Sequence, residues 1–177
     1  MPLPAAVVQG AMRGKLKGRT VQNLVKNGNF ADGTTGWIPS SVSGFQVIDG
    51  VAEFTGTAQY AIVQQDVGKK PSHKMFFFAT ILSDSSEVAL YLNDGFGQYG
   101  AAHSGSGNFE RISGIYTTQA MSTTTTVKVQ DNRVSGWTKI KVYGVGIIDL
   151  TAEGLTNLTE DQLNQKFSHY IDGVQSV

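Results

Sequence analysis

Side chains that could perform acid–base, nucleophilic or metal chemistry are few in this chain of 177 residues. The histidines are three, His73, His103 and His169, and no two of them have the spacing of a metal-ligating pair. The absence of Cys excludes disulfides, zinc–thiolate sites and a cysteine nucleophile. The glycine-rich segments lack both a Gly-x-Ser-x-Gly turn and a phosphate-binding Lys. These residues predict a protein that is not an enzyme and that has no metal site.

Carboxylates are the one remaining source of catalysis. A glycosidase needs two acids that project into one cleft. Glu53, Asp66, Glu87 and Glu110 could supply such a pair only if the fold gathers them, so a small glycan hydrolase or lyase stays a hypothesis.

Aromatic and amide side chains on outward strand faces give a stronger signal. Residues 88–93 alternate, so Val88, Leu90 and Leu92 predict a core face and leave Tyr91 and Asn93 on the other. By the same alternation Val127 and Val129 point inward, while Lys128 and Gln130 point outward. A flat aromatic ring stacks on the C–H face of a sugar at little entropic cost, and amides bind hydroxyls. The predicted carbohydrate-binding residues are Tyr91, Asn93, Phe96, Tyr99, Gln130 and Arg133, with Phe96 and Tyr99 expected in a mobile loop.

The sequence predicts that these side chains lie on short β-strands and on the turns that join them. The chain has 21 Gly and 4 Pro, and its strand signals recur every 8–12 residues or so. Asp49-Gly50 predicts a hairpin turn. Residues 74–82 are almost continuously apolar, which is typical of a strand covered on both faces. We therefore expect an all-β fold, a two-sheet antiparallel β-sandwich, with Trp137 in a structural position at the start of the last long strand.

The two ends of the chain differ from this pattern. Thr159 and Gln162 form a capping-box pattern, and Leu163, Phe167, Tyr170 and Ile171 follow at helical spacing, so we expect a short C-terminal α-helix. Residues 1–20 contain four bases and no acid: Arg13, Lys15, Lys17 and Arg19. This segment is either a disordered tail or a basic attachment arm that orders on an acidic partner. The expected domains are 1–20, 21–150 and 151–177.

Charge and hydropathy exclude several classes of partner. The 14 acids balance the 14 bases, which disfavours a dedicated nucleic-acid binder. The sequence contains no run of about 18 apolar residues, so it predicts no membrane-spanning helix. The N-terminal apolar run is short and its charges follow it, so we do not expect a signal peptide, and the protein should be made in a cytoplasm.

Two segments carry a resemblance to a known family. Residues 23–37, with Asn27-Gly28-Asn29-Phe30 followed by Asp32-Gly33 and Trp37, resemble the opening of jelly-roll carbohydrate-binding modules. Phage tail and other virion proteins often carry such modules, and residues 145–163 resemble the tail of phage-associated ones. The resemblance implies that the sandwich is a jelly roll and that Trp37 packs structurally at its edge. It also implies a phage virion protein of the tail, baseplate or a fibre that contacts host-surface glycan. It further implies attachment to other virion proteins through the arm, homo-oligomers and location in the virion.

The resemblance also raises the question of a structural calcium. The family holds the ion with acids of its opening motif and a late Asp. Here the motif has Asn29 and Ala31 in place of acids, while Asp32 and Asp149 remain. Because calcium needs several charged oxygens, we expect no cofactor, with calcium a doubtful exception.

A second functional hypothesis belongs to another class. The sandwich faces would then be protein–protein interfaces of a purely architectural or decoration subunit that binds no sugar. Cover of Tyr91 and Phe96 by a neighbouring chain would favour it.

Overall fold

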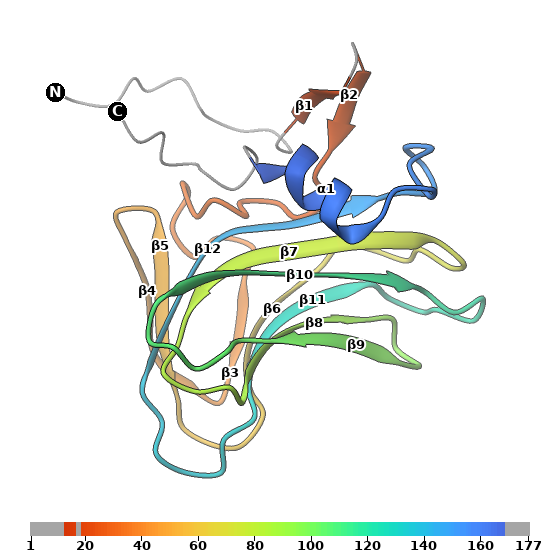
Figure 1. The fold of residues 1–177 in the computed structure, drawn as a ribbon. Coiled ribbons are helices and arrows are strands. Elements are labelled where there is room, and N and C mark those ends of the chain that lie inside the picture. Colours follow the sequence, from red (N-terminus) through yellow and green to blue (C-terminus); the bar gives the residue numbers. More distant parts are fainter. Residues whose placement is uncertain (1–12, 17–18, 169–177) are drawn as a thin grey trace, which may run out of the picture.

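A computed structural model shows a sandwich of two five-stranded antiparallel sheets (Figure 1). It describes residues 13–16 and 19–168, with side chains from residue 21 onward. The strands are β1 (Arg13–Leu16), β2 (Arg19–Gln22), β3 (Ile38–Ser40), β4 (Val42–Ile48), β5 (Val51–Gly56), β6 (Ala61–Asp66), β7 (Lys74–Leu82), β8 (Val88–Asn93), β9 (Gln98–Ala102), β10 (Phe109–Thr117), β11 (Thr126–Asp131) and β12 (Lys139–Asp149), and the helix is α1 (Glu160–Lys166).

Ten of the twelve strands divide equally between the two sheets of the sandwich. One has the order β10-β7-β12-β5-β4 and carries α1 on its outer side, and we call it the helix-covered sheet. The other has the order β3-β6-β11-β8-β9, and we call it the open sheet. The expected all-β sandwich with a short C-terminal helix is confirmed.

The main core fills the space between the sheets. It contains Phe54, Phe77 and Ile147 from the helix-covered sheet and Leu90 and Val129 from the open sheet, all fully buried or nearly so. The predicted alternation in β8 and β11 is confirmed, since Val88, Leu92 and Val127 join this cluster. Trp37 is also buried, as expected, and packs against Phe30 with the two rings tilted by 30°.

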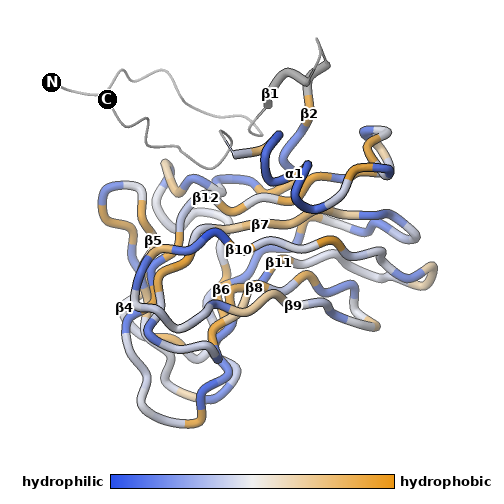
Figure 2. Tube along the Cα trace, viewed as in Figure 1, coloured by the Kyte–Doolittle hydropathy of each residue, from blue (hydrophilic) through white to orange (hydrophobic). Residues whose placement is uncertain are grey.

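A second apolar cluster lies on the outer side of the helix-covered sheet. Phe76 and Phe78 of β7 point away from the main core and pack with Ile148, Leu163 and Phe167. Strand β7 therefore has cover on both faces, and its hydrophobic character runs along most of its length (Figure 2). The helix begins with the predicted capping box, because the Thr159 hydroxyl accepts from the Gln162 amide. Tyr170 and Ile171 lie outside the described residues.

The long strand β12 changes partner halfway along. Its register shifts between Tyr143 and Gly146; before the shift it pairs with β5, and after it the chain bridges to Asn23. The Asn23 amide is fully buried, accepts from the backbone N–H groups of Val25 and Ile147 and donates to the Val145 carbonyl. This side chain satisfies backbone groups that the irregular pairing leaves without a partner.

Part of the N-terminal segment has structure of its own. β1 and β2 pair as an antiparallel hairpin, and β2 runs across residue 20, where the sequence separated arm from sandwich. Arg13, Lys15 and Arg19 lie on these strands, while Lys17 lies outside the described residues. At the predicted hairpin, Asp49 and Gly50 both take positive φ and join β4 to β5. None of the helices formed by the described residues is long and apolar enough to cross a membrane.

Candidate functional site

The outer face of the open sheet presents a row of side chains that crosses all five strands. In the pairing register, Ile38 of β3 lies beside Gln64 of β6, then Lys128, Tyr91 and Gly100 follow on β11, β8 and β9. Four strand spacings make this row roughly 19 Å long. Directly paired residues share one face of a sheet, so these side chains form a continuous polar and aromatic strip.

Tyr91 has a defined position within this strip. A Cβ atom at Gly100 would lie 2.2 Å from Tyr91 Cε1 and 2.5 Å from its Cδ1, so the ring occupies the space over the glycine. The Asn132 amide lies 3.3 Å from the Tyr91 hydroxyl and donates to it. A ring held over Gly100 and tethered at its hydroxyl is a preorganised platform, because little rotamer freedom remains to be lost on binding.

Amide side chains surround the ring. Gln130 donates to Asn132 at 2.5 Å, which links it to the Tyr91 hydroxyl through that amide. Asn93 and Gln98 form the next pair along β8 and β9, with 3.5 Å between the Asn93 amide and the Gln98 carbonyl. Gln64 faces the same side from β6. Gln64, Asn93 and Gln98 can offer both donors and acceptors to the hydroxyl groups of a bound ligand, whereas Gln130 is buried and acts through Asn132.

Phe96 occupies the tight turn at the end of the β8–β9 hairpin, and 51% of its surface is exposed. Asp94 builds this turn, since its buried carboxylate accepts from the amides of Phe96 and Gly97 and from Gln119 across the sandwich. Burial alone would raise the pKa of Asp94, but these hydrogen bonds and one from Tyr116 outweigh it and lower the pKa. The turn is therefore fastened by an ionised carboxylate, and the exposed aromatic sits on a fixed loop.

Tyr99 does not lie with Tyr91, contrary to the sequence prediction. The turn is only Asp94 to Gly97, so residue 98 already begins β9, and the register pairs Tyr99 with the inward-facing Leu92. The Tyr99 ring accordingly meets Phe77 edge-on, with 6.1 Å between centroids. It closes the edge between the two sheets instead of joining the outer strip.

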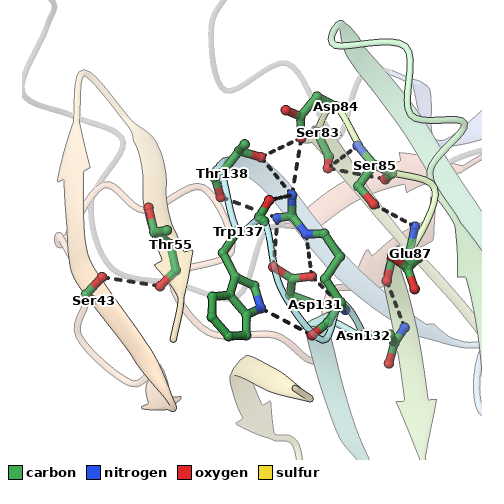
Figure 3. A network of polar contacts seen from close by, with 12 residues as sticks. Ser43, Thr55, Ser83, Asp84, Ser85, Glu87, Asp131, Asn132, Trp137 and Thr138 are labelled. Carbon is green, nitrogen blue, oxygen red and sulfur yellow. Dashed lines mark hydrogen bonds and ion pairs between the residues drawn. The ribbon is translucent and has the colours of Figure 1, made fainter. Parts of the chain in front are cut away.

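Arg133 was also expected on the binding surface, and the structure places it elsewhere. Its guanidinium is buried against Asp131, with Nε and Nη2 at 2.8 and 2.7 Å from the two carboxylate oxygens. The hydrogen bonds to Asp131 raise the pKa of Arg133 further above its usual value. Thr138 and Asp84 converge on the same group (Figure 3). This network ties the β11–β12 loop to the β7–β8 loop and leaves the guanidinium engaged within the chain.

Of the six predicted binding residues, the structure thus brings three onto the outer face, Tyr91, Asn93 and Gln130, and places Phe96 at its end. The sequence showed Lys128 as outward-facing, but Lys128 was not among the predicted binding residues. Gln64 and Ile38, which share this face, were not predicted at all. Ile38 belongs to a three-residue strand that follows a run of turns, which is too short to show a period. Gln64 and Gln65 give no alternation of polarity; Gln65 turns out to point inward and clamps the backbone of Lys26.

The residues that the resemblance offered for calcium do not suit a hard cation. The Asp149 carboxylate lies 2.7 Å from His73 Nδ1 and 3.7 Å from Lys70 Nζ, so basic groups already occupy its surroundings. Asn29 uses its side-chain oxygen to accept from the Ala31 amide. Within the described part of the chain, His, Asp and Glu residues form no group of three that could hold a metal ion.

Two of the four carboxylates considered for hydrolysis, Glu53 and Glu110, are engaged near their own strands. Glu53 of the helix-covered sheet binds Lys139 and Gln46 at 2.9 and 2.8 Å, and these bonds, that to Lys139 foremost, lower its pKa. Glu110 binds the hydroxyls of Ser104 and Ser106, which lower its pKa to about 2. Neither carboxyl has the raised pKa that a general acid needs near neutral pH.

Comparisons with known proteins support the fold. No family model and no curated protein sequence matches this chain. A solved structure described as "CBM4 structure and function" superposes with a TM-score of 0.59, over 70% of this chain and 98% of that one, at 14% identity. A family 16 carbohydrate-binding module gives 0.49, over 71% and 99%, at 17% identity. The enzymatically active domain of bacteriophage CBA120 tailspike protein 4 also gives 0.49, over 71% of this chain and 21% of that one, at 13% identity. The first likeness establishes a fold of the carbohydrate-binding-module type.

Proposed function

We propose that the protein binds carbohydrate through the outer face of the open sheet. The observation that carries this proposal is the Tyr91 ring, which lies over Gly100 and is tethered to Asn132. A sugar stacked on the ring would have Asn93 beside it along β8, and a longer glycan that crosses the strands would reach Gln64, because these residues share one face. Each stacking contact contributes about 0.5–1.5 kcal/mol beyond area burial, so a single copy binds weakly.

The cellular setting that we infer is a phage virion, as a structural protein of the tail, baseplate or a fibre. Both ends of the sandwich sequence resemble virion-borne modules, and the segment before it is basic, with Arg13, Lys15, Lys17 and Arg19. Attachment through this segment to other virion proteins would display many copies on one particle. Multivalent display strengthens weak sugar binding without any new contact, which suits adhesion to a host-cell polysaccharide.

The sugar half of the proposal is tested with a glycan array probed by the full chain displayed on a multivalent carrier. We expect Tyr91→Ala to abolish the signal. Tyr143→Ala is the matched control, because Tyr143 is also half-buried but belongs to the helix-covered sheet. Absence of signal from the assembled form would contradict sugar binding and favour the architectural role. Equal loss in both folded variants would contradict the placement of the site at Tyr91.

The virion half has a separate test. Electron microscopy of particles labelled with an antibody against this chain should locate it on the tail, baseplate or fibres. Its absence from purified particles would contradict the assignment, whatever the array shows.

A further inference from the structure

The outer face of the open sheet carries one lysine at its centre. Lys128 lies on β11, the middle strand, between Gln64 and Tyr91. The other outward positions of the five strands are neutral except Asp66, so the face holds one positive and one negative side chain. A cation at the middle of a binding strip determines which ligands it accepts.

Lys128 differs from several other cations of this chain because it has no carboxylate partner among the described residues. Lys139 on the helix-covered sheet meets the Glu53 carboxylate at 2.9 Å, and Arg133 is bidentate to Asp131. Among the residues that the structure describes, none offers a carboxylate within ion-pair distance of Lys128. Asp66 is committed elsewhere, since its two oxygens accept from Gly68 N at 2.7 Å and from the Thr124 hydroxyl at 2.6 Å.

The surroundings of Lys128 also remove part of its hydration. Its side chain is half-buried, and burial lowers the pKa of its ammonium group. The fold thus places a partly dehydrated positive charge on an open surface without an internal counter-ion. An anion that arrives with the ligand would be attracted strongly to this ammonium group, because less water screens the attraction at this position.

We propose that the glycan recognised by this face is acidic, and that Lys128 pairs with an anionic substituent of a sugar ring stacked on Tyr91. This inference rests on the proposed function and narrows its ligand class. An ammonium group is a point charge without a planar preference, so a uronic-acid carboxylate and a phosphate would both satisfy it. Asp66 at the end of the face repels the same ligands and keeps the anion over the central strand.

The test uses the full chain and an array in which acidic glycans stand beside matched neutral forms. Polygalacturonate and other uronates are compared with their carboxyl-reduced counterparts, and a glycerol-phosphate teichoic acid provides the phosphate arm. We expect the acidic forms to bind about tenfold or more tightly than the reduced forms, as a charge-assisted hydrogen bond gives. The arm that binds identifies the source of the anion.

Variants then assign the preference to one residue. Lys128→Met should reduce binding of the acidic glycan to the level of its reduced form, and Lys128→Arg should retain the preference. Lys69→Met is the matched control, because Lys69 is exposed in the β6–β7 loop. Asp66→Asn should strengthen acidic binding severalfold by removing the opposing charge.

The outcomes separate this inference from the function on which it rests. Equal binding of acidic and reduced glycans, or a preference that survives in folded Lys128→Met, overturns the role of Lys128 and leaves carbohydrate binding intact. Failure of every glycan to bind overturns the proposed function, and this inference with it.

Discussion

The outer faces of the two sheets differ in what lies on them. On the helix-covered sheet, Phe76, Phe78 and Ile148 form an apolar surface that Leu163 and Phe167 bury. On the open sheet, the equivalent surface is mixed: amides, Tyr91, Lys128 and Asp66 lie beside small residues and the isoleucines of β3 and β6. The comparison shows that the composition of each face follows its burial. The face that α1 buries is apolar and forms part of the core, and the exposed face carries the side chains that can bind a ligand.

Docking of α1 explains why the covered face is not available to a ligand. Besides the apolar contacts, Asn164 accepts from Arg111 at 2.7 Å and donates to Ser113 at 2.9 Å, and Ser113 also donates to Glu160. These polar contacts fix the helix against β10 at the edge of the apolar cluster. A fixed helix makes the covered face a stability element, so substitutions there should act on unfolding and not on binding.

The largest effect that separates the two faces is expected from Phe76→Ala. Phe76 is fully buried and stacks on Phe167 with 5.9 Å between centroids. We expect the free energy of unfolding to fall by about 3–5 kcal/mol, as for other buried aromatic truncations. Tyr91→Ala, on the open face, should cost less than about 1 kcal/mol. Urea denaturation measures both values, and equal costs would break the distinction between the faces.

Gly100→Ala should act on binding more than on stability. The added methyl group needs the space that the Tyr91 ring occupies, so the ring must leave its position over Gly100. We expect glycan affinity to fall by up to about tenfold, the full value of a stacking contact, with a change in unfolding free energy below about 1 kcal/mol. Isothermal titration calorimetry measures the first quantity. Unchanged affinity would show that the position of the ring does not matter.

A smaller effect is expected when the helix cap is removed. In Thr159→Ala the Gln162 amide loses its acceptor, which costs about 1 kcal/mol. Hydrogen exchange should then increase in α1, while β8 and β11 keep the exchange rates of the unmodified protein. Faster exchange in the open sheet would show that the two outer faces are coupled.

The smallest effect appears only in acid and concerns the Phe96 turn. Because hydrogen bonds hold the folded pKa of Asp94 below its ordinary value of 3.8, Asp94 contributes stability above that pH, and the contribution is lost as the pH falls through the folded pKa. Asp94→Asn should therefore show a shallower loss of unfolding free energy below pH 4. Identical pH profiles for the two proteins would contradict the role of the carboxylate.

Residues with a clear local period were predicted correctly from the sequence. Alternation in β8 and β11 placed Tyr91 and Gln130 on one face, and the double-covered β7 was identified from its continuous apolar run. The capping box and the Asp49-Gly50 turn were likewise local signals. In each case the physical cause lies within a few residues of its effect.

The remaining features depend on contacts that the sequence does not display. Tyr99 was misplaced because the face of β9 depends on the length of the turn before it, and a shift of one residue reverses every side chain. Arg133 follows Asp131 by two residues in what reads as an exposed loop, but the network with Asp84 and Thr138 buries it. Gly100 carries no side chain, so its relation to Tyr91 emerges only from the register.

The most direct test of the central claim is a map of the glycan on the folded chain. Backbone amide chemical shifts are recorded by NMR during titration with the strongest ligand from the array. We predict that the shifts concentrate on the open sheet, at Gln64, Lys128, Tyr91 and Asn93, and leave β7, β10 and α1 unchanged. Shifts concentrated on the helix-covered sheet, with Tyr91 unaffected, would contradict it.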